Sequence, residues 1–290
     1  MTQIIPASLV ASCAKTPARA EWLEHLPGVI LELARRWSLT LGAPFEGEDV
    51  SCSWVAPAVG LGDTRVVLKI GMPHMEGEHE IDGLRLLDGD PTVCLLDADD
   101  KYGAMLLERC EPGTSLRELP EEEQDVVIAE LLRLFWRTPP PGHPFRQLSV
   151  MLDHWTAVTR LDADKWPDRS LVEEGLDLFE DLAETAQSNM LLATDLHAGN
   201  VLRDERGPWV AIDPKPFMGD PAYDATQHLL NCRVRLRSRG MDTINRFADL
   251  LDVDRDRVQL WTFARLAAEP RDDWDDEATS LARLLAPVRL

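Results

Sequence analysis

The chain has 290 residues, of which 44% are apolar, so it can bury a large core and is neither a peptide nor a coiled coil. It carries 30 Lys and Arg against 51 Asp and Glu, a formal charge of −21. Such a charge repels nucleic acid and anionic lipid and favours a cationic small-molecule partner, although acidity can also serve solubility alone.

Five scattered cysteines without a C-x-x-C motif indicate a reducing compartment rather than a disulfide framework. No apolar run reaches the roughly 18 residues of a membrane span. The segment Val10–Cys13 resembles a lipoprotein cleavage site, but no Lys or Arg precedes it and Pro6 interrupts the apolar run. We therefore expect a soluble cytoplasmic protein, a monomer or weak dimer, with residues 1–14 forming a loosely docked arm.

An apolar period of three to four residues over Ala18–Leu39 predicts a helix, which Pro27 divides into two. The following chain alternates apolar and polar residues and predicts a small antiparallel sheet of five strands. The strands are expected at Asp49–Ser51, Ser53–Ala56, Thr64–Ile70, Thr92–Leu96 and Tyr102–Leu107, with a turn at Asp97–Asp100 between the last two.

Lys69 lies inside an apolar strand, and a helix is expected to follow at Glu76–Leu87. A strand lysine held by a glutamate on the next helix is the phosphate contact of kinase-type enzymes, so Lys69 and Glu80 are candidates for that pair. Two alternatives remain. Lys69 can point to solvent, and His74, Glu76, His79 and Glu80 can be interpreted as metal ligands, although their spacing is not typical of a zinc site.

Strand character ends at Glu108, and Pro112-Gly113 marks a connection. We place the domain boundary there, with residues 1–108 forming a nucleotide-binding lobe and residues 109–290 a helical catalytic and substrate-binding lobe. A connector at this point would offer Glu108 and Cys110 to an adenine edge. The helices of the second lobe are expected at Glu121–Trp136, Gln147–Leu161, Ser170–Ala186, Met241–Leu251, Asp254–Ala267 and Trp274–Leu285, with a further helix start at Asp220-Pro221.

The segment from Asp195 to Asp213 predicts a β-hairpin with its tip near Arg206-Gly207. If the tip is centred there, Asn200 faces Asp213 at the open end, and Asp195 lies close enough in the sequence to join them. Two carboxylates and an amide oxygen suit Mg²⁺, which is usually held by one or two carboxylates plus substrate phosphates. Asp, Asn and Gly are also ordinary turn residues, which is the alternative interpretation.

Five ordered segments together resemble the aminoglycoside phosphotransferases, and more narrowly their streptomycin 6-phosphotransferase and hydroxyurea phosphotransferase branch. The segments are V-V-L-K-I, G-E-H-E-I-D-G-L-R-L-L, M-L-L-E-R-C-E-P-G-T-S-L, D-L-H-A-G-N-V-L and A-I-D-P-K-P-F-M-G-D-P-A-Y-D. The resemblance implies an α+β, protein-kinase-like fold of two lobes that binds ATP and Mg²⁺.

The resemblance also implies residue roles. Asp195 would be the catalytic base, Asn200 and Asp213 the metal ligands, and Lys69 with Glu80 the phosphate contact. Asp220 would bond the backbone of the catalytic loop. The candidates for holding a polycationic sugar are Glu269, Asp272, Asp273, Trp274 and Asp275, although such a charge run is also typical of a solvated helix start.

Two departures from the family pattern matter. Ala193-Thr194 stands where the family usually has a histidine two positions before the catalytic Asp, so a hydrogen bond that supports the loop is lost or replaced. The loop expected to cover the phosphates, near Val50–Trp54, contains no glycine, and Ser51 and Ser53 would have to compensate through their hydroxyls.

The sequence therefore predicts an ATP-dependent O-phosphotransferase that modifies an aminoglycoside and confers resistance. One alternative keeps the chemistry but changes the acceptor to hydroxyurea or a biosynthetic intermediate. The other is a kinase-like binding module without turnover.

Overall fold

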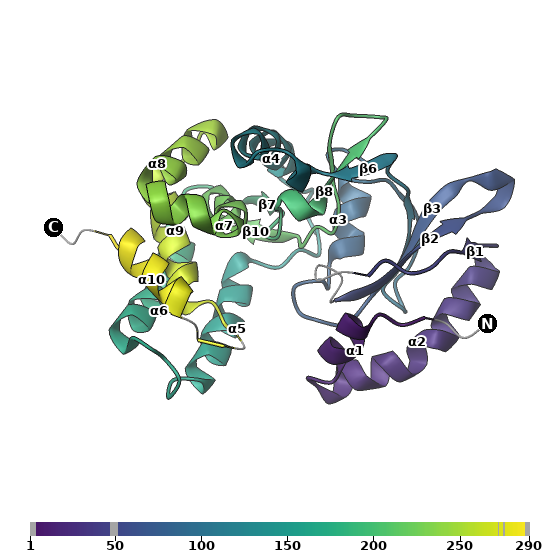
Figure 1. The fold of residues 1–290 in the computed structure, drawn as a ribbon, viewed down its shortest axis with the longest axis horizontal. Coiled ribbons are helices and arrows are strands. Elements are labelled where there is room, and N and C mark those ends of the chain that lie inside the picture. The colour runs from purple at the N-terminus through teal and green to yellow at the C-terminus, as the bar shows by residue number, and fades with distance from the viewer. Residues whose placement is uncertain (1–3, 47–51, 272, 275, 288–290) are drawn as a thin grey trace. The chain divides into compact units, whose positions relative to one another are not determined.

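A computed structural model describes residues 4–46, 52–271, 273–274 and 276–287 (Figure 1). The chain divides into two compact units. The first consists of Met1–Thr114 with Leu202–Ile212, and the second of Ser115–Val201 with Asp213–Leu290. The first holds a five-stranded antiparallel sheet and the second is mostly helical, which confirms the predicted fold class.

The sheet of the first unit has the strand order β1-β2-β3-β5-β4. Its strands are β1 (Thr40–Leu41), β2 (Ser53–Val59), β3 (Arg65–Gly71), β4 (Leu95–Asp99) and β5 (Ala104–Glu108). The predicted strand Asp49–Ser51 lies outside the described residues, and β1 supplies the fifth strand. The predicted turn at Asp97–Asp100 is wrong, because Asp97 and Asp99 belong to β4, where Trp37 and Arg36 donate to their carboxylates.

Helices α1 (Ala7–Cys13) and α2 (Pro17–Arg36) pack on one face of this sheet. Leu9 and Cys13 are fully buried, so the prediction of a loosely docked N-terminal arm is wrong. The prediction of two helices at Pro27 is also wrong, because α2 is continuous through it. Burial of the apolar face of α2 against the sheet offsets the hydrogen bond that Pro27 cannot donate.

The other face of the sheet is covered by α3 (Glu80–Leu87) and by part of the predicted hairpin, β8 (Val201–Asp204) and β9 (Val210–Ala211). Strand β6 (Pro112–Ser115) completes a three-stranded sheet with β8 and β9. At the hairpin tip, Arg206 pairs with Glu108 and donates to the Gly89 carbonyl at 3.2 Å. These contacts explain why Leu202–Ile212 belongs to the first unit. Helix α3 begins at Glu80 rather than at the predicted Glu76, because residues 75–79 form turns.

The second unit contains the remaining α-helices, most of which pack on α9 (Figure 1). They are α4 (Glu121–Phe135), α5 (Leu148–Leu161), α6 (Arg169–Glu184), α7 (Pro221–Asn231), α8 (Arg233–Leu251), α9 (Arg255–Ala268) and α10 (Asp276–Leu285). A two-stranded ladder pairs β7 (Met190–Leu192) with β10 (Phe217–Gly219). Gly175 of α6 lets α9 approach closely, since a Cβ there would lie 2.8 Å from the Ala267 Cβ.

Helix α8 starts at Arg233, before the predicted Met241. All five cysteines are free thiols. Within the described residues, no helix combines the length and apolar character needed to cross a membrane.

Candidate active site

The loop that follows β7 carries Asp195 and ends in the short 3-10 helix η3 (Ala198–Asn200). Thr194 has a φ of 51°, a left-handed conformation that is an outlier for a β-branched residue. Such a conformation persists only where the surroundings fix it. Here the Thr194 hydroxyl donates to the Lys215 carbonyl at 2.6 Å, and the Lys215 N–H donates to the Ala193 carbonyl at 3.1 Å. The hydrogen bond expected to be lost or replaced at Ala193-Thr194 is therefore replaced.

Asp224 of α7 binds the backbone of the same loop through hydrogen bonds. Its carboxylate accepts from the N–H groups of Ala193 at 2.9 Å and Thr194 at 2.8 Å, and from the Trp136 indole at 3.0 Å. The side chain is 1% exposed. Burial raises its pKa to about 6, although the three N–H donors and the charge of Arg265 act in the opposite direction.

The role predicted for Asp220 was to bond this loop, and that prediction is wrong. Asp220 instead caps α7 by accepting from the Ala222 N–H at 3.0 Å. Its other oxygen accepts from Arg257 at 2.7 Å and from the Trp261 indole at 2.9 Å. The physical reason is position, because the N-cap residue faces the first turn of its own helix, whereas Asp224 lies one turn further along.

Asn200 lies beside Asp195, since its side-chain amide donates to the Asp195 carbonyl at 3.0 Å. Because the NH₂ group is engaged there, the amide oxygen is the atom that Asn200 offers to a cation. Asp213 has a φ of 54° and forms an ion pair with Lys215, whose N–H joins its segment to the Asp195 loop. One carboxylate and one amide oxygen are hard donors that fit Mg²⁺ held mainly by nucleotide phosphates.

Among the residues that the structure describes, no group of three His, Cys, Asp or Glu could hold a metal ion by itself. This includes the alternative ligands His74, Glu76, His79 and Glu80.

Lys69 and Glu80 form a buried ion pair in the first unit, with Nζ and Oε1 separated by 2.5 Å. Their exposed fractions are both 5%. Lys69 shares a sheet face with Val67, and α3 packs on that face, so the alternative in which the lysine points to solvent is wrong. The pairing itself is the arrangement that the sequence predicts.

The remaining nucleotide candidates lie in or near the same sheet, apart from Ser51, which is outside the described residues. Ser53 of β2 lies opposite Gly71 of β3, so it is on the same face of the sheet as Lys69. Glu108 does not offer a backbone N–H to a ligand, because that group donates to the Cys94 carbonyl at 3.0 Å. Its carboxylate pairs with Arg206 and accepts from the Cys94 N–H at 2.7 Å. Cys110 is buried, which raises the pKa of its thiol to about 12.

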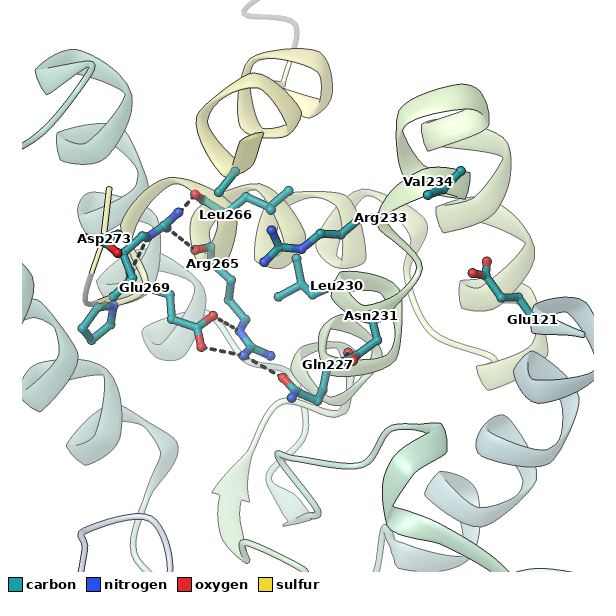
Figure 2. Close-up of a pocket in the computed structure, with 13 residues that line it drawn as sticks. Glu121, Gln227, Leu230, Asn231, Arg233, Val234, Arg265, Leu266, Glu269 and Asp273 are labelled. Atoms are coloured by element: carbon teal, nitrogen blue, oxygen red, sulfur yellow. Dashed lines mark hydrogen bonds and ion pairs between the residues drawn. The ribbon is translucent and has the colours of Figure 1, made fainter. Parts of the chain in front are cut away.

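A pocket of about 490 Å³ lies in the second unit, among α7, α8, α9 and the segment after α9 (Figure 2). Acidic, basic and amide side chains line it together with apolar groups. The polar members are Glu121, Gln227, Asn231, Arg233, Arg265, Glu269, Arg271 and Asp273. The lining is thus of mixed charge rather than purely acidic.

The candidate substrate residues are distributed unevenly around this pocket. Glu269 and Asp273 line it, with Asp273 exposed and Glu269 paired with Arg265 at 2.9 Å. Trp274 is not among the lining residues and instead packs near Arg271 and Trp166. Asp272 and Asp275 lie outside the described residues.

The sequence reading missed Gln227 and Arg265, which connect this pocket to the loop. Gln227 donates to the Asp195 carboxylate at 2.7 Å, and Arg265 donates to the Gln227 carbonyl oxygen at 2.8 Å. The one feature of the sequence that could have indicated Gln227 was its position three residues after Asp224, which places both side chains on the same side of α7. Nothing in the sequence indicated Arg265.

Comparison with known proteins shows that residues 39–273 match the family model of the aminoglycoside/hydroxyurea antibiotic resistance kinases. Streptomycin 6-kinase of Streptomyces glaucescens is 34% identical over 96% of this chain and 93% of its own length. Hydroxyurea phosphotransferase of Kitasatospora aureofaciens is also 34% identical, over 90% of this chain and 78% of its own. These matches confirm the resemblance drawn from the sequence.

Among solved structures, aminoglycoside phosphotransferase APH(4)-Ia, in a ternary complex with AMP-PNP and hygromycin B, has a similar fold. The TM-score is 0.56 at 16% identity, covering 88% of this chain and 95% of that one. At this identity the likeness is evidence of the fold alone.

Proposed function

Because the chain belongs to the aminoglycoside/hydroxyurea antibiotic resistance kinase family, we propose that it transfers the γ-phosphoryl group of ATP to a hydroxyl of a cationic aminoglycoside such as streptomycin. The observation that carries this proposal is the Asp195 loop, in which the Asn200 amide donates to the Asp195 backbone carbonyl and the Asp195 carboxylate accepts from Gln227. Phosphorylation would add about two negative charges to the drug and weaken its binding to RNA.

In this proposal Asp195 accepts the proton of the attacking hydroxyl. Asp195 is half-buried, and the loop around it is fixed by Asp224, Lys215 and Gln227. A base held in this way loses little freedom when the hydroxyl arrives, so the geometry favours proton transfer during attack.

Asn200 and Asp213 would hold the metal ion of Mg²⁺·ATP, and Lys69, oriented by Glu80, would contact the phosphates. When bound, the metal neutralises charge on the phosphoryl group that is transferred. Asp213 already pairs with one cationic group, the Lys215 ammonium. Ser53 and Cys110 remain candidates for further contacts with the nucleotide.

The acceptor would bind in the pocket that Glu269 and Asp273 line. Because arginines line it too, we assign recognition to individual carboxylates and amides rather than to a wholly acidic surface. Arg265 is balanced by Glu269, and Glu121 pairs with Arg235 at 3.3 Å, which leaves Asp273 as the carboxylate best placed for a cationic group.

Hydroxyurea is the second candidate acceptor, favoured by the relative that is a hydroxyurea phosphotransferase. A binding module without turnover was suggested by Ala193-Thr194. The bonds from Thr194 to Lys215 and Asp224 weaken that suggestion, because the loop is anchored without the histidine.

The test is ADP release from Mg²⁺·ATP in the presence of streptomycin, other aminoglycosides or hydroxyurea, with the product identified by ³¹P NMR. We expect turnover with streptomycin and a loss of about 100-fold or more in kcat for Asp195→Asn. The matched control is Asp177→Asn, which changes an exposed carboxylate on α6 and should leave kcat unaltered. Turnover with hydroxyurea alone would reassign the acceptor, and equal rates for wild type and Asp195→Asn would refute the proposed chemistry.

A further inference from the structure

Gln227 connects two charged groups of opposite sign in the second unit. From α7, its Nε2 lies 2.7 Å from the Asp195 Oδ1, and its Oε1 lies 2.8 Å from the Arg265 Nη2. A single neutral side chain therefore bridges the proposed base and a guanidinium.

The orientation of the Gln227 amide follows from this arrangement. Arginine only donates hydrogen bonds, so the oxygen of the amide must face Arg265. The NH₂ group is then obliged to face Asp195, as a carboxylate requires. Turning the amide over would set NH₂ against guanidinium and oxygen against carboxylate.

Arg265 is itself fixed (Figure 2). It is 4% exposed and donates to both oxygens of Glu269 at 2.9 Å and to the Thr226 hydroxyl at 2.8 Å. Its guanidinium also lies over the rings of Trp155, at 5.5 Å, and Tyr223, at 5.3 Å. Burial alone would lower the pKa of Arg265, but Glu269 raises it well above its ordinary value, so the group stays charged.

We infer that Gln227 is a positioning residue for Asp195, and that Arg265 fixes the direction of its amide. The inference rests on the proposed function, because it concerns the same base. Gln227 holds one carboxylate oxygen of Asp195 in place without neutralising it, so the carboxylate remains able to accept a proton.

The contacts from Asp195 through Gln227 and Arg265 to Glu269 also reach the acceptor pocket. Glu269 is partly exposed and lines that pocket together with Gln227 and Arg265. The same three side chains therefore form part of the pocket wall and hold the base, so an acceptor bound there is placed relative to a fixed carboxylate.

Two substitutions that keep the approximate shape of Gln227 test whether its NH₂ group must donate to Asp195. Gln227→Met removes both hydrogen bonds, and we expect kcat to fall about 10-fold to 100-fold, as for the loss of a hydrogen bond to a charged group. Gln227→Glu keeps a partner for Arg265 but sets a second carboxylate against Asp195. We therefore expect Gln227→Glu to lose more activity than Gln227→Met, with the KM for ATP unchanged in both.

A purely structural role predicts the reverse order, because Gln227→Glu satisfies Arg265 and Gln227→Met does not. The matched control is Gln259→Met on α9, which also removes an amide donor, here to the Leu285 carbonyl at 3.0 Å, and should retain wild-type kcat. In addition, Gln227→Met should have little further effect in an Asp195→Asn background, because a residue that acts through Asp195 has nothing left to position.

The outcomes separate the inference from the proposed function. If wild type turns over no acceptor faster than Asp195→Asn, the proposed function fails, and the inference fails with it. If wild type is active but Gln227→Glu matches wild type or exceeds Gln227→Met, the proposed function stands and the inference alone is overturned. Additive losses in the double variant would overturn it as well. Reduced melting temperatures with unchanged kcat would show a structural role only.

Discussion

Two buried carboxylates, Glu80 in the first unit and Asp224 in the second, are stabilised in different ways. In the first, Lys69 and Glu80 form a buried pair of side chains with opposite charges, on consecutive elements β3 and α3. In the second, Asp224 is fully buried and its three hydrogen-bond donors are uncharged, two of them backbone N–H groups of the Asp195 loop. The first arrangement balances charge, whereas the second uses an unbalanced carboxylate to shape a loop.

This difference determines whether a second substitution can restore the stability that a first one removes. A buried pair of side chains can be replaced as a unit by apolar residues, often without loss of stability. Only proline removes a backbone N–H group, and its fixed φ near −65° is incompatible with the φ of 51° at Thr194. No simple second substitution therefore compensates for the loss of Asp224.

The largest effect is expected in the first unit. Lys69→Met leaves Glu80 buried without its partner and should lower the free energy of unfolding by about 3–5 kcal/mol. Lys69→Met combined with Glu80→Met should recover most of that loss, although both variants lose phosphotransferase activity. Urea denaturation measures the stability, and ADP release measures the activity.

An exposed ion pair supplies the control. Arg169 on α6 pairs with Glu173, and both side chains are more than half exposed. Arg169→Ala should change the free energy of unfolding by no more than about 0.5 kcal/mol. If Lys69→Met lowers the free energy of unfolding by as little as Arg169→Ala, or if the double variant is no more stable than Lys69→Met alone, the two charges of the pair do not balance each other.

The second prediction concerns pH and Asp224. Burial raises its pKa from 3.8 to about 6, so between these values the folded state binds more protons than the unfolded state. Asp224 therefore makes its full contribution to the free energy of unfolding below about pH 3.8, and this contribution is lost as the pH rises through about 6. Two pKa units correspond to about 3 kcal/mol.

Asp224→Asn isolates this effect because it keeps the shape but cannot ionise. The difference in unfolding free energy, wild type minus variant, should fall by about 3 kcal/mol between about pH 4 and pH 7. Since all other titrating groups are common to both proteins, they cancel in the difference. A difference that stays constant with pH would show that Asp224 is not buried as an unbalanced charge.

The sequence predicted the first arrangement better than the second, and the reason is physical. A lysine on a strand and a glutamate on the next helix are close in the chain and have opposite charges, so their pairing can be inferred from residue types. Asp224 was noticed only as part of a helix start, because its partners are backbone groups that every residue carries. The same reading assigned the loop contact to Asp220, whose position at the helix N-terminus commits it to the cap.

Other parts of the site depend on residues distant in the sequence. Gln227 and Arg265 reach Asp195 only because α7 and α9 pack together in the second unit. Likewise, α1 was missed because its two buried residues, Leu9 and Cys13, form too short a pattern to be recognised without the sheet that covers them. A contact between elements that are neighbours in the chain was therefore predicted, whereas contacts between elements distant in the sequence were not.

The smallest effect is expected from Thr194→Val, which removes one hydroxyl and keeps the β-branched shape. The lost bond to the Lys215 carbonyl should lower the free energy of unfolding by about 1 kcal/mol. Because the left-handed backbone at Thr194 immediately precedes Asp195, kcat should also fall, by about 10-fold. Thr194→Ser retains the hydroxyl and should remain close to wild type in both measurements. If Thr194→Val instead has wild-type kcat while Asp224→Asn does not, the carboxylate alone fixes the loop, and the second arrangement depends on one side chain rather than on two.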